Sequence, residues 1–549
     1  MRTATRPTLL TPAILFCGAM WACCLTSMAA ERPNVVFILA DDLGYGDVAC
    51  FGGDRCRIAT PHFDRLAAQG LRFTDAHANA SVCVPTRMAI MTGRYPWRFA
   101  KPEPGGPWGF LGLRLPPTQH TLGSLMQTAG YRTGYVGKWH LGTRMQTTDG
   151  KTQGLTNVNY GKPLEVGPQQ FAFNHSFILP GSLDMFPYAF VQNNAWVGRV
   201  TAQKGWSAFN RVGPAAEDFL DTKVLDTFSA QAEQFLARSA AEAKAGQPFF
   251  LYLALTAPHT PTSPSPQFAG RSEIGIYGDF VMETDHCIGR VLTALKSHGL
   301  DDNTLVIATS DHGPAPYAGR QRKATAGQLK QLEQAGHYSA GIYRGYKFSV
   351  YEGGLRVPFV VRWPGTVRAG STCEQLVGLQ DLMATLSEIT QVSLQATQGP
   401  DSISMLPLLQ DPQSQPTRTS MVLEGTRGKV IRSGVWKLAL CPGSGSRGVW
   451  GNAPADVDAW RQAVQNFGRN PSSHAELAQA PFVQLFHLER DPGETTNLAG
   501  EHPEQVRQLL ALLQTQIDNG RSTPGTKLRN DRPRIKPFSS VPPFVWNKK

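Results

Sequence analysis

The sequence has little charge and, after its first 30 residues, no long apolar run. Charged residues make up 17% of the 549 residues and hydrophobic residues 41%. This balance excludes intrinsic disorder, which needs high charge and low hydrophobicity. No collagen period, heptad run or fixed-length repeat is present, so fibrous and solenoid architectures are excluded. Glycine and proline are plentiful instead, with 54 and 40 residues, and predict many loops around a globular core.

Signs of nucleic-acid binding are also lacking. The chain has no helix-turn-helix, zinc-finger spacing or basic patch interleaved with aromatic residues. The formal net charge is +11, and the basic residues are scattered apart from the tail 527–549. We therefore expect a solvated basic surface and no nucleic-acid partner, although a positive field favours polyanionic substrates by steering.

Cysteine is scarce and shows no metal-finger spacing. Three of the nine cysteines fall within the first 30 residues. No close CxxC pair exists, and at this density disulfides are not the scaffold. Cys50 and Cys56 could pair, or could equally be small buried hydrophobic residues. The six cysteines beyond the N-terminal segment are Cys50, Cys56, Cys83, Cys287, Cys373 and Cys441.

Residues 1–30 have the pattern of an export signal. Arg2 and Arg6 supply the positive start, residues 9–25 are mostly apolar, and the small residues 27–30 suit cleavage. An uncleaved membrane anchor is the alternative, because the apolar stretch approaches the ~20 residues that span a bilayer. Cleavage predicts an exported protein, periplasmic or extracellular, with no stable membrane insertion.

The segment from 31 to 410 alternates between strand and helix patterns. The segment 34–40 contains an unbroken apolar run, which is typical of a parallel strand buried on both faces. The alternation predicts an α/β domain with a large, mostly parallel sheet flanked by helices. The expected strands are 34–40, 71–76, 131–136, 248–255 and 304–309, and the expected helices are 61–69, 121–129, 229–243 and 279–298.

The pattern changes near residue 410, after which we expect a smaller α+β subdomain, 411–519. Short strands with glycine turns predict an antiparallel sheet, and the apolar spacing of 503–519 predicts an amphipathic helix. Residues 443–480 are polar and irregular, as expected of an insertion, and 520–549 form a basic, proline-rich tail expected to be extended or disordered. The expected strands are 420–423, 429–432, 436–440 and 482–488.

Acidic and polar side chains follow two of the predicted parallel strands. Asp41 and Asp42 come directly after the first strand, and Asp311 and His312 follow the strand 304–309. Functional groups gather at the carboxyl ends of such strands, where these four could form an oxygen-rich pocket for Ca²⁺ or Mg²⁺. The alternative is that the Asp-Asp pair only caps a turn.

A third segment changes the balance between these alternatives. Cys83-Val84-Pro85-Thr86-Arg87, continued to Thr92-Gly93-Arg94, resembles the sulfatase signature C-x-P-S/T-R followed by a hydrophobic stretch and T-G-R. Other motifs of the type I sulfatase family appear in the family's order between about residues 32 and 498. They are the opening strand with Asp41-Asp42-Leu43-Gly44, Gly137-Lys138-Trp139-His140-Leu141-Gly142, Pro258-His259-Thr260-Pro261, Ser310-Asp311-His312-Gly313, Lys347 with Glu352-Gly353-Gly354-Leu355-Arg356, and Asp491-Pro492-Gly493-Glu494 to Leu498.

The resemblance implies an alkaline-phosphatase-like fold, with a large mixed, mostly parallel sheet, and a formylglycine-dependent sulfatase. In that family the signature cysteine, here Cys83, is oxidised by a maturation enzyme to the aldehyde 3-oxoalanine. Its hydrate has one oxygen that attacks sulfur and a second that later loses its proton and expels sulfate, which is covalent catalysis. Asp41, Asp42, Asp311 and His312, with the converted Cys83 against the same ion, would hold one divalent cation, usually Ca²⁺. His312 stands where the family often has Asn.

The remaining roles also follow from the resemblance. Arg87 would position the hydrate and stabilise its anion. Lys138 and Lys347 would grip sulfate oxygens and offset the charge of the transition state. His140 would act as the base that eliminates sulfate, and His259 would protonate the leaving alcohol or help to bind sulfate.

The expected function is hydrolysis of sulfate monoesters. Basic charge, export and the loop-rich segments 101–117 and 150–212 suit a sulfated carbohydrate as substrate. One alternative is a phosphonate or phosphate ester hydrolase of the same superfamily. Another, from a different class, is a glycan-binding protein without turnover, should Cys83 remain a thiol.

Overall fold

The computed structural model describes residues 1, 3–4, 32–205, 210–318, 328–426, 428–441, 444–445, 483–535 and 537. The predicted export signal lies almost entirely outside these residues, as do most of the predicted insertion and the end of the predicted tail. The described residues from 32 onward belong to one compact unit. Across the described ranges, no helix combines the length and the apolar character that a bilayer span requires.

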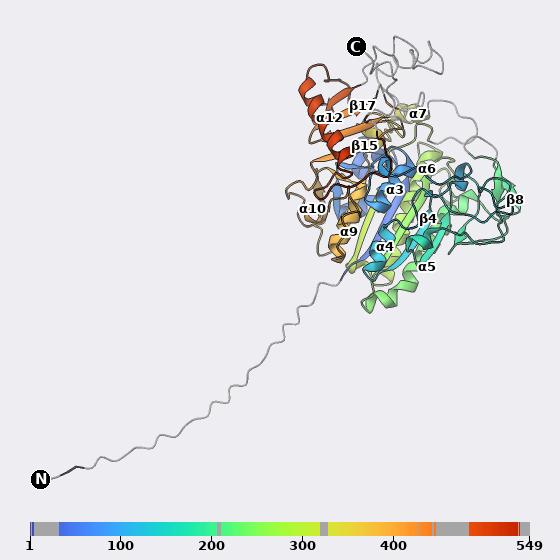
Figure 1. Ribbon diagram of the computed structural model, residues 1–549. Coiled ribbons are helices and arrows are strands. Elements are labelled where there is room, and N and C mark those ends of the chain that lie inside the picture. Colours follow the sequence, from blue (N-terminus) through green and yellow to red (C-terminus); the bar gives the residue numbers. More distant parts are fainter. Residues whose placement is uncertain are drawn as a thin grey trace. The chain divides into compact units, whose positions relative to one another are not determined.

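A mixed sheet of ten strands forms the centre of this unit (Figure 1). Its strand order is β13-β2-β12-β11-β1-β10-β4-β5-β6-β7. The middle of the sheet, from β11 to β5, is parallel, whereas β12 is antiparallel to both β11 and β2. The strands are β1 Asn34–Asp41, β2 Leu71–Phe73, β4 Arg132–Lys138, β5 His175–Leu179, β6 Val191–Gln192, β7 Ala195–Trp196, β10 Phe249–Pro258, β11 Thr304–Ser310, β12 Phe359–Arg362 and β13 Ser371–Cys373.

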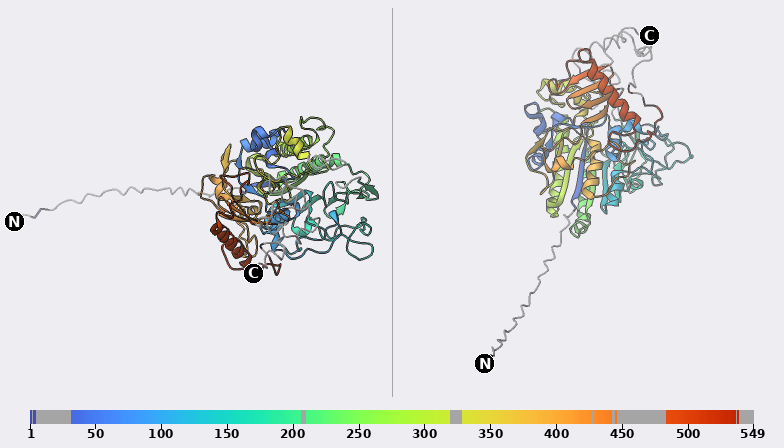
Figure 2. Two further views of the ribbon diagram at one scale, coloured as in Figure 1. Left: turned by 90° about the horizontal axis from the view of Figure 1, so that it is seen from above. Right: turned by 60° about the vertical axis from the view of Figure 1, so that its left-hand side comes forward.

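Helices cover both faces of this sheet (Figures 1 and 2). Neighbouring residues of β4 show the two sides. Gly134 faces α5 so closely that an added Cβ would lie 2.6 Å from the ring of Phe235, while Tyr135 packs on the opposite face against Trp139 and Phe173. The helices are α1 Ala49–Gly52, α2 Pro61–Ala68, α3 Cys83–Thr92, α4 Leu122–Thr128, α5 Val224–Lys244, α6 Ile276–Ser297, α7 Gln328–Gln334, α8 Glu352–Leu355, α9 Leu382–Thr390 and α10 Leu406–Gln410.

The C-terminal part contains a separate antiparallel sheet with its own hydrophobic cluster. The sheet has the order β15-β16-β17-β18, and α12 (Pro503–Asp518) covers it through Leu509, Leu513 and Ile517. Its strands are β15 Ser420–Glu424, β16 Lys429–Ser433, β17 Trp436–Leu440 and β18 Gln484–His487. Two-stranded pairs complete the strand set: β3 Ala76–His77 with β14 Val377–Gly378, and β8 Ala202–Lys204 with β9 Gly213–Ala215.

The predicted mixed, mostly parallel sheet with a smaller antiparallel sheet is confirmed, with local differences. The expected strand 71–76 is divided into β2 and β3, and Asp75, which lies between them, pairs with Arg432. The segment 150–212, expected to be loops, contributes β5 to the edge of the parallel part of the sheet. The domain boundary at residue 410 stays a prediction, as do the other boundaries.

Candidate functional site

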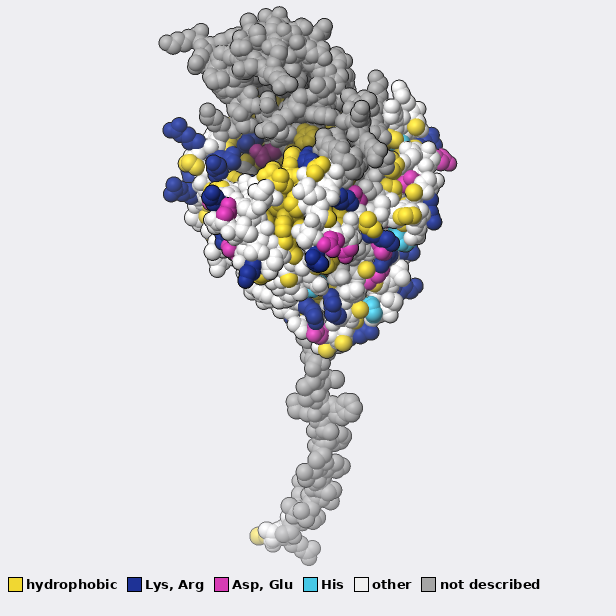
Figure 3. Space-filling model, turned by 90° about the vertical axis from the view of Figure 1, so that its right-hand side faces the viewer, with side chains coloured by type: hydrophobic (Ala, Val, Ile, Leu, Met, Phe, Trp, Pro, Cys, Tyr) yellow, Lys and Arg dark blue, Asp and Glu magenta, His cyan; other side chains and the backbone are white. Residues whose placement is uncertain are grey.

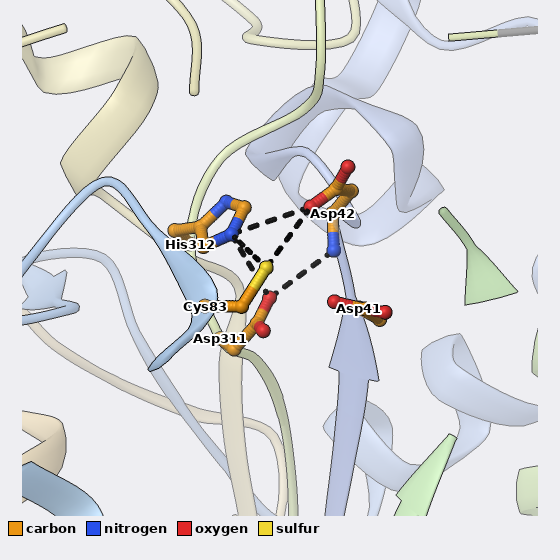
Figure 4. Close-up of side chains that lie close together, drawn as sticks. All are labelled: Asp41, Asp42, Cys83, Asp311 and His312. Atoms are coloured by element: carbon orange, nitrogen blue, oxygen red, sulfur yellow. Dashed lines mark hydrogen bonds and ion pairs between the residues drawn. The ribbon is translucent and has the colours of Figure 1, made fainter. Parts of the chain in front are cut away.

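Five buried side chains from three separate segments meet at one edge of the large sheet (Figure 4). One potential ligand atom of each lies within 4.8 Å of the others. Cys83 Sγ is 3.1 Å from His312 Nε2 and 4.0 Å from Asp42 Oδ1. The five residues are Asp41, Asp42, Cys83, Asp311 and His312.

Parallel pairing of β1 and β11 brings the two acidic segments together. Ala40 lies opposite Ser310 in this ladder, so the residues that follow both strands emerge side by side. The main-chain N–H of Asp42 then donates to Asp311 Oδ1 at 3.2 Å. Asp42 has φ 65°, a left-handed conformation that aspartate tolerates better than most residues. Only glycine fits at position 44, because a Cβ there would lie 2.0 Å from the carbonyl oxygen of Ser339.

Helix α3 supplies the cysteine and an arginine. Cys83 is its first residue and is 3% exposed. One turn later, Arg87 donates from Nε and Nη2 to Asp311 Oδ2 at 3.1 and 2.9 Å, and its Nη2 lies 3.4 Å from Asp41 Oδ1. The buried guanidinium therefore holds the helix start against both acidic segments.

Two lysines reach the same carboxylates from other directions. Lys138, at the end of β4, places Nζ 2.5 Å from Asp41 Oδ2. Lys347 donates to both oxygens of Asp42 at 2.7 and 2.9 Å. Both are essentially excluded from solvent, so they are not the solvated surface groups that single lysines usually are.

Two further histidines border the cluster. His259 follows β10, with Nε2 3.7 Å from Asp42 Oδ2 and Nδ1 2.5 Å from the carbonyl oxygen of Thr260. His140 has φ 53°, and its buried Nδ1 has no hydrogen-bond partner in the described part of the chain. The structure thus brings together every residue that the sequence nominated; their individual roles stay predictions.

Burial and neighbouring charge set the protonation of these groups. Burial would raise the pKa of Asp41, but Lys138, His259 and Arg87 hold that pKa well below its usual value. Burial, followed by the positive charges of Lys138 and Arg87, lowers the pKa of His140 far below its usual value. Burial also raises the pKa of the Cys83 thiol well above its usual value. An unmodified Cys83 is therefore a neutral thiol and a poor nucleophile, since the thiolate is the reactive form.

The donor set fits a divalent cation. Three carboxylates provide the hard oxygen ligands that Ca²⁺ and Mg²⁺ require. Asp41 Oδ1 is buried and accepts no hydrogen bond from any described residue, so it has an unused lone pair. Nδ1 of His312 donates to the Gly313 carbonyl at 2.9 Å, and burial lowers the pKa of His312 to about 4. The lone pair of its neutral ring at Nε2 consequently faces the cluster.

Two residues beside the site were not predicted from the sequence. Asp184 is buried, bonds Arg211 at 2.7 Å and lies 3.9 Å from Nδ1 of His259. Tyr317 lies under Nζ of Lys347, 5.7 Å from the ring centroid. Asp184 follows β5. The short apolar pattern of that strand was the signal in the sequence that could have pointed to Asp184.

A second buried cluster of Asp75, His77 and Glu352 has a different character. Its carboxylates already pair with cations: Arg432 and Arg356 reach Asp75 at 2.6 and 2.8 Å. Glu352 accepts from His77, Arg356 and Lys437 at 2.8, 2.8 and 2.9 Å. Every carboxylate oxygen of Asp75 and Glu352 accepts a hydrogen bond, whereas Asp41 Oδ1 in the first cluster accepts none from the described residues. We therefore interpret this second cluster as structural. We call it the linking network, since β16 and β17 reach the large sheet through it.

Comparison with known proteins gives a consistent result. The family model described as Sulfatase matches residues 33–392. N-acetylgalactosamine-6-O-sulfatase of Bacteroides thetaiotaomicron is 32% identical over 525 residues, covering 88% of this chain and 93% of the relative. Human arylsulfatase A is 32% identical over 509 residues, covering 89% of each chain. A solved structure from work on the metabolism of multiple glycosaminoglycans by Bacteroides thetaiotaomicron aligns with a TM-score of 0.73 and 30% identity, covering 88% of this chain and 99% of that one.

Proposed function

Because this chain belongs to the sulfatase family, we propose that it removes sulfate from sulfated carbohydrates, using a formylglycine made from Cys83 and one bound Ca²⁺. The chain is a sulfuric ester hydrolase, and its reaction is R–O–SO₃⁻ + H₂O → R–OH + SO₄²⁻ + H⁺. One observation carries the proposal: Cys83 lies within 4.8 Å of four metal-type ligands, with three buried cations bonded to the same carboxylates.

When present, the hydrated aldehyde supplies the nucleophile, and the cation acts as a Lewis acid on a sulfate oxygen. Asp41, Asp42, Asp311 and His312 would hold that cation. Arg87 fixes the start of α3 and so orients the side chain of residue 83 toward the carboxylates. The buried ammonium groups of Lys138 and Lys347 bind sulfate oxygens and offset negative charge that develops on them.

The two histidines complete the acid–base chemistry. His140 stays neutral at physiological pH, because burial and its cationic neighbours depress its pKa, and a neutral imidazole can accept a proton. His259 lies on the other side, beside Asp42 and Asp184, where it would protonate the departing alcohol or help to bind sulfate. Burial, followed by the positive charge of Lys347, lowers the pKa of His259 well below its usual value.

The substrate class rests on several separate supports. The B. thetaiotaomicron relative is named as an N-acetylgalactosamine-6-O-sulfatase, so a 6-O-sulfated N-acetylhexosamine is the first substrate to test. The net charge of +11 favours anionic glycans. We also propose export to the periplasm or the extracellular space, where the mature chain would begin near residue 31, and maturation of Cys83 by a formylglycine-generating enzyme.

The test combines mass spectrometry with kinetics. In protein from the native host, we expect the tryptic peptide with residue 83 to be lighter by about 18 Da, the difference between cysteine and formylglycine. Cys83→Ala should abolish turnover and keep the fold, whereas Cys287→Ala, an equally buried thiol on α6, should retain activity. A thiol at residue 83 in fully active protein, or full activity of Cys83→Ala, contradicts the mechanism.

The same preparation separates the alternative functions. Desulfation of defined sulfated oligosaccharides supports the proposal. A preference for phosphonate or phosphodiester substrates over sulfate esters indicates a phosphorus-ester hydrolase. Binding of sulfated glycans without any turnover, together with an unmodified Cys83, indicates a binding protein.

A further inference from the structure

A cleft of about 570 Å³ opens beside the reaction centre. Val84 and Pro85, which directly follow Cys83, line it together with His140. This volume falls within the range of small-ligand pockets. The part of a substrate that lies beyond the sulfate group therefore has room here.

An aromatic side chain gives one part of the cleft the character of a sugar platform. Trp108 is 37% exposed, which is unusual for a large ring, and it lines the cleft. The guanidinium of Arg211 lies over its ring, 3.5 Å from the centroid, and holds the indole in place through a cation–π contact. A rigid, amphipathic ring of this kind suits the apolar face of a pyranose.

Two arginines in the cleft have no carboxylate partner among the described residues. The main-chain N–H of Arg114 donates to the carbonyl of Leu141 at 3.0 Å, which places Arg114 next to His140. Its Nε is buried and makes no hydrogen bond to any described group. Arg532 also lines the cleft, and its side chain is exposed. A cationic group without a partner is suited to bind an anion from a ligand.

The position of Arg532 is fixed by the residues around it. The carboxylate of Asp531 accepts from both terminal nitrogens of Arg94 at 2.7 and 3.1 Å. The main-chain N–H groups of Asp531 and Arg532 lie 3.0 and 3.2 Å from the carbonyl oxygen of Arg98, and Asn530 Oδ1 accepts from Arg98 Nη1 at 2.9 Å. Thus the segment after α12, irregular in conformation, is anchored beside α3 and forms a wall of the cleft.

The acidic residue that lines this cleft does not neutralise the positive charges of Arg114 and Arg532. Glu424 lines the cleft, but its Oε1 accepts from Nζ of Lys429 at 3.0 Å. The carboxylate is thereby paired. The net character of the cleft is cationic. Elsewhere on the surface, the face in Figure 3 shows basic side chains mixed with acidic ones and a patch of exposed hydrophobic side chains.

We infer that this cleft binds the sugar adjoining the sulfated one, and that Arg532 and Arg114 recognise a second anionic group on it. The inference rests on the proposed function and narrows it: the preferred substrates are glycan fragments with a carboxylate or a second sulfate next to the residue that loses its sulfate. Arg532 and Arg114 are then specificity-determining residues, and residues after α12 take part in substrate selection.

The test uses three disaccharides with the same sulfated sugar and linkage, whose second sugar is neutral, carries a carboxylate, or carries a sulfate. The readout is the ratio of kcat/KM for each anionic disaccharide to that for the neutral one. We expect this ratio to be about tenfold in the unmodified protein, of the size expected for one charge-assisted contact, and to fall to near one in Arg532→Gln, chiefly through KM. Arg114→Gln should lower the ratio in the same way.

Arg534→Gln is the matched control, because it removes the same charge two residues away. Arg534 lines a neighbouring depression over α12 and not this cleft, so the ratio should stay high. A preference for the carboxylate alone, or for the sulfate alone, supports the inference and identifies the anion. Ratios near one for both anionic disaccharides in the unmodified protein, or equal losses in Arg532→Gln and Arg534→Gln, overturn it. Absence of turnover with every sulfate ester would instead contradict the proposed function.

Discussion

Removing Arg432 tests the linking network that joins the C-terminal sheet to the catalytic part. Arg432 projects from β16 and donates from both terminal nitrogens to the two oxygens of Asp75 at 2.6 Å each. Both side chains are nearly inaccessible to water. Asp75 lies eight positions before Cys83, and Glu352 of the same network lies five positions after Lys347. The network therefore supports two segments that carry site residues.

The loss in the free energy of unfolding caused by Arg432→Met depends on the partners that Asp75 keeps. A buried ion pair that loses one partner leaves an uncompensated charge, which typically costs about 3–5 kcal/mol. Arg356 still lies 2.8 Å from Asp75, so we expect the lower end, about 3 kcal/mol. With an unfolding entropy of ~2.1 cal/mol/K per residue over ~500 residues, this corresponds to a fall in Tm of about 3 °C.

The loss of stability in Arg432→Met should become smaller at acidic pH. Burial would raise the pKa of Asp75, but Arg356 and Arg432 hold it below its usual value. A depressed carboxyl pKa stabilises the fold above the unfolded-state pKa of about 3.9 and loses that contribution as the pH falls through the folded-state value. The difference in Tm between the two proteins should therefore be full at pH 7 and shrink below about pH 4.

Thermal unfolding between about pH 3 and pH 7 measures both the fall in Tm and its dependence on pH. Arg507→Met on α12 is the matched control, because Arg507 pairs with Glu504 at 2.6 Å with both side chains about two-thirds exposed, and such a surface pair contributes at most about 0.5 kcal/mol. Asp75→Asn combined with Arg432→Met should cost less than the sum of the single changes. A loss below about 1 °C, or one equal to that of the control, refutes the reasoning.

Two further predictions concern the cation and the sheet. Ca²⁺ at 100 times its Kd should stabilise the metal-free protein by about 2.7 kcal/mol, raising Tm by roughly 3 °C, and Asp311→Asn should reduce this response; an identical response in both proteins contradicts the proposed ligand set. Gly134→Ala should destabilise by about 1–3 kcal/mol through overpacking, since its Cβ would lie 2.6 Å from Phe235. Gly500→Ala, with nothing within 4 Å, should have a much smaller effect in the same denaturant titration.

Much of the architecture could be predicted because its signals are local. Buried parallel strands such as β1 and β10 require continuous apolar runs, and the helix α6 requires apolar residues on one face, so both leave a readable pattern. Strands β5 and β12 were not predicted, because they are short and lie among loops and motif residues. Their assignment depends on neighbouring strands that are distant in the sequence.

In the site, too, the features that depend on local sequence could be predicted, and those that depend on long-range contacts could not. The sequence alone was enough to nominate the residues that we propose carry the chemistry, because a side chain's identity and its motif are local properties: Cys83, the acidic pairs, the lysines and the histidines. How those groups act on one another depends on the folded structure. The compensation of Asp41 by Lys138 and Arg87, and the approach of Asp184 to His259, join residues that lie far apart along the chain. The same holds for Arg532, which reaches the cleft only because the chain after α12 returns to α3. Distances and burial arise from folding, and they set charge, pKa and specificity.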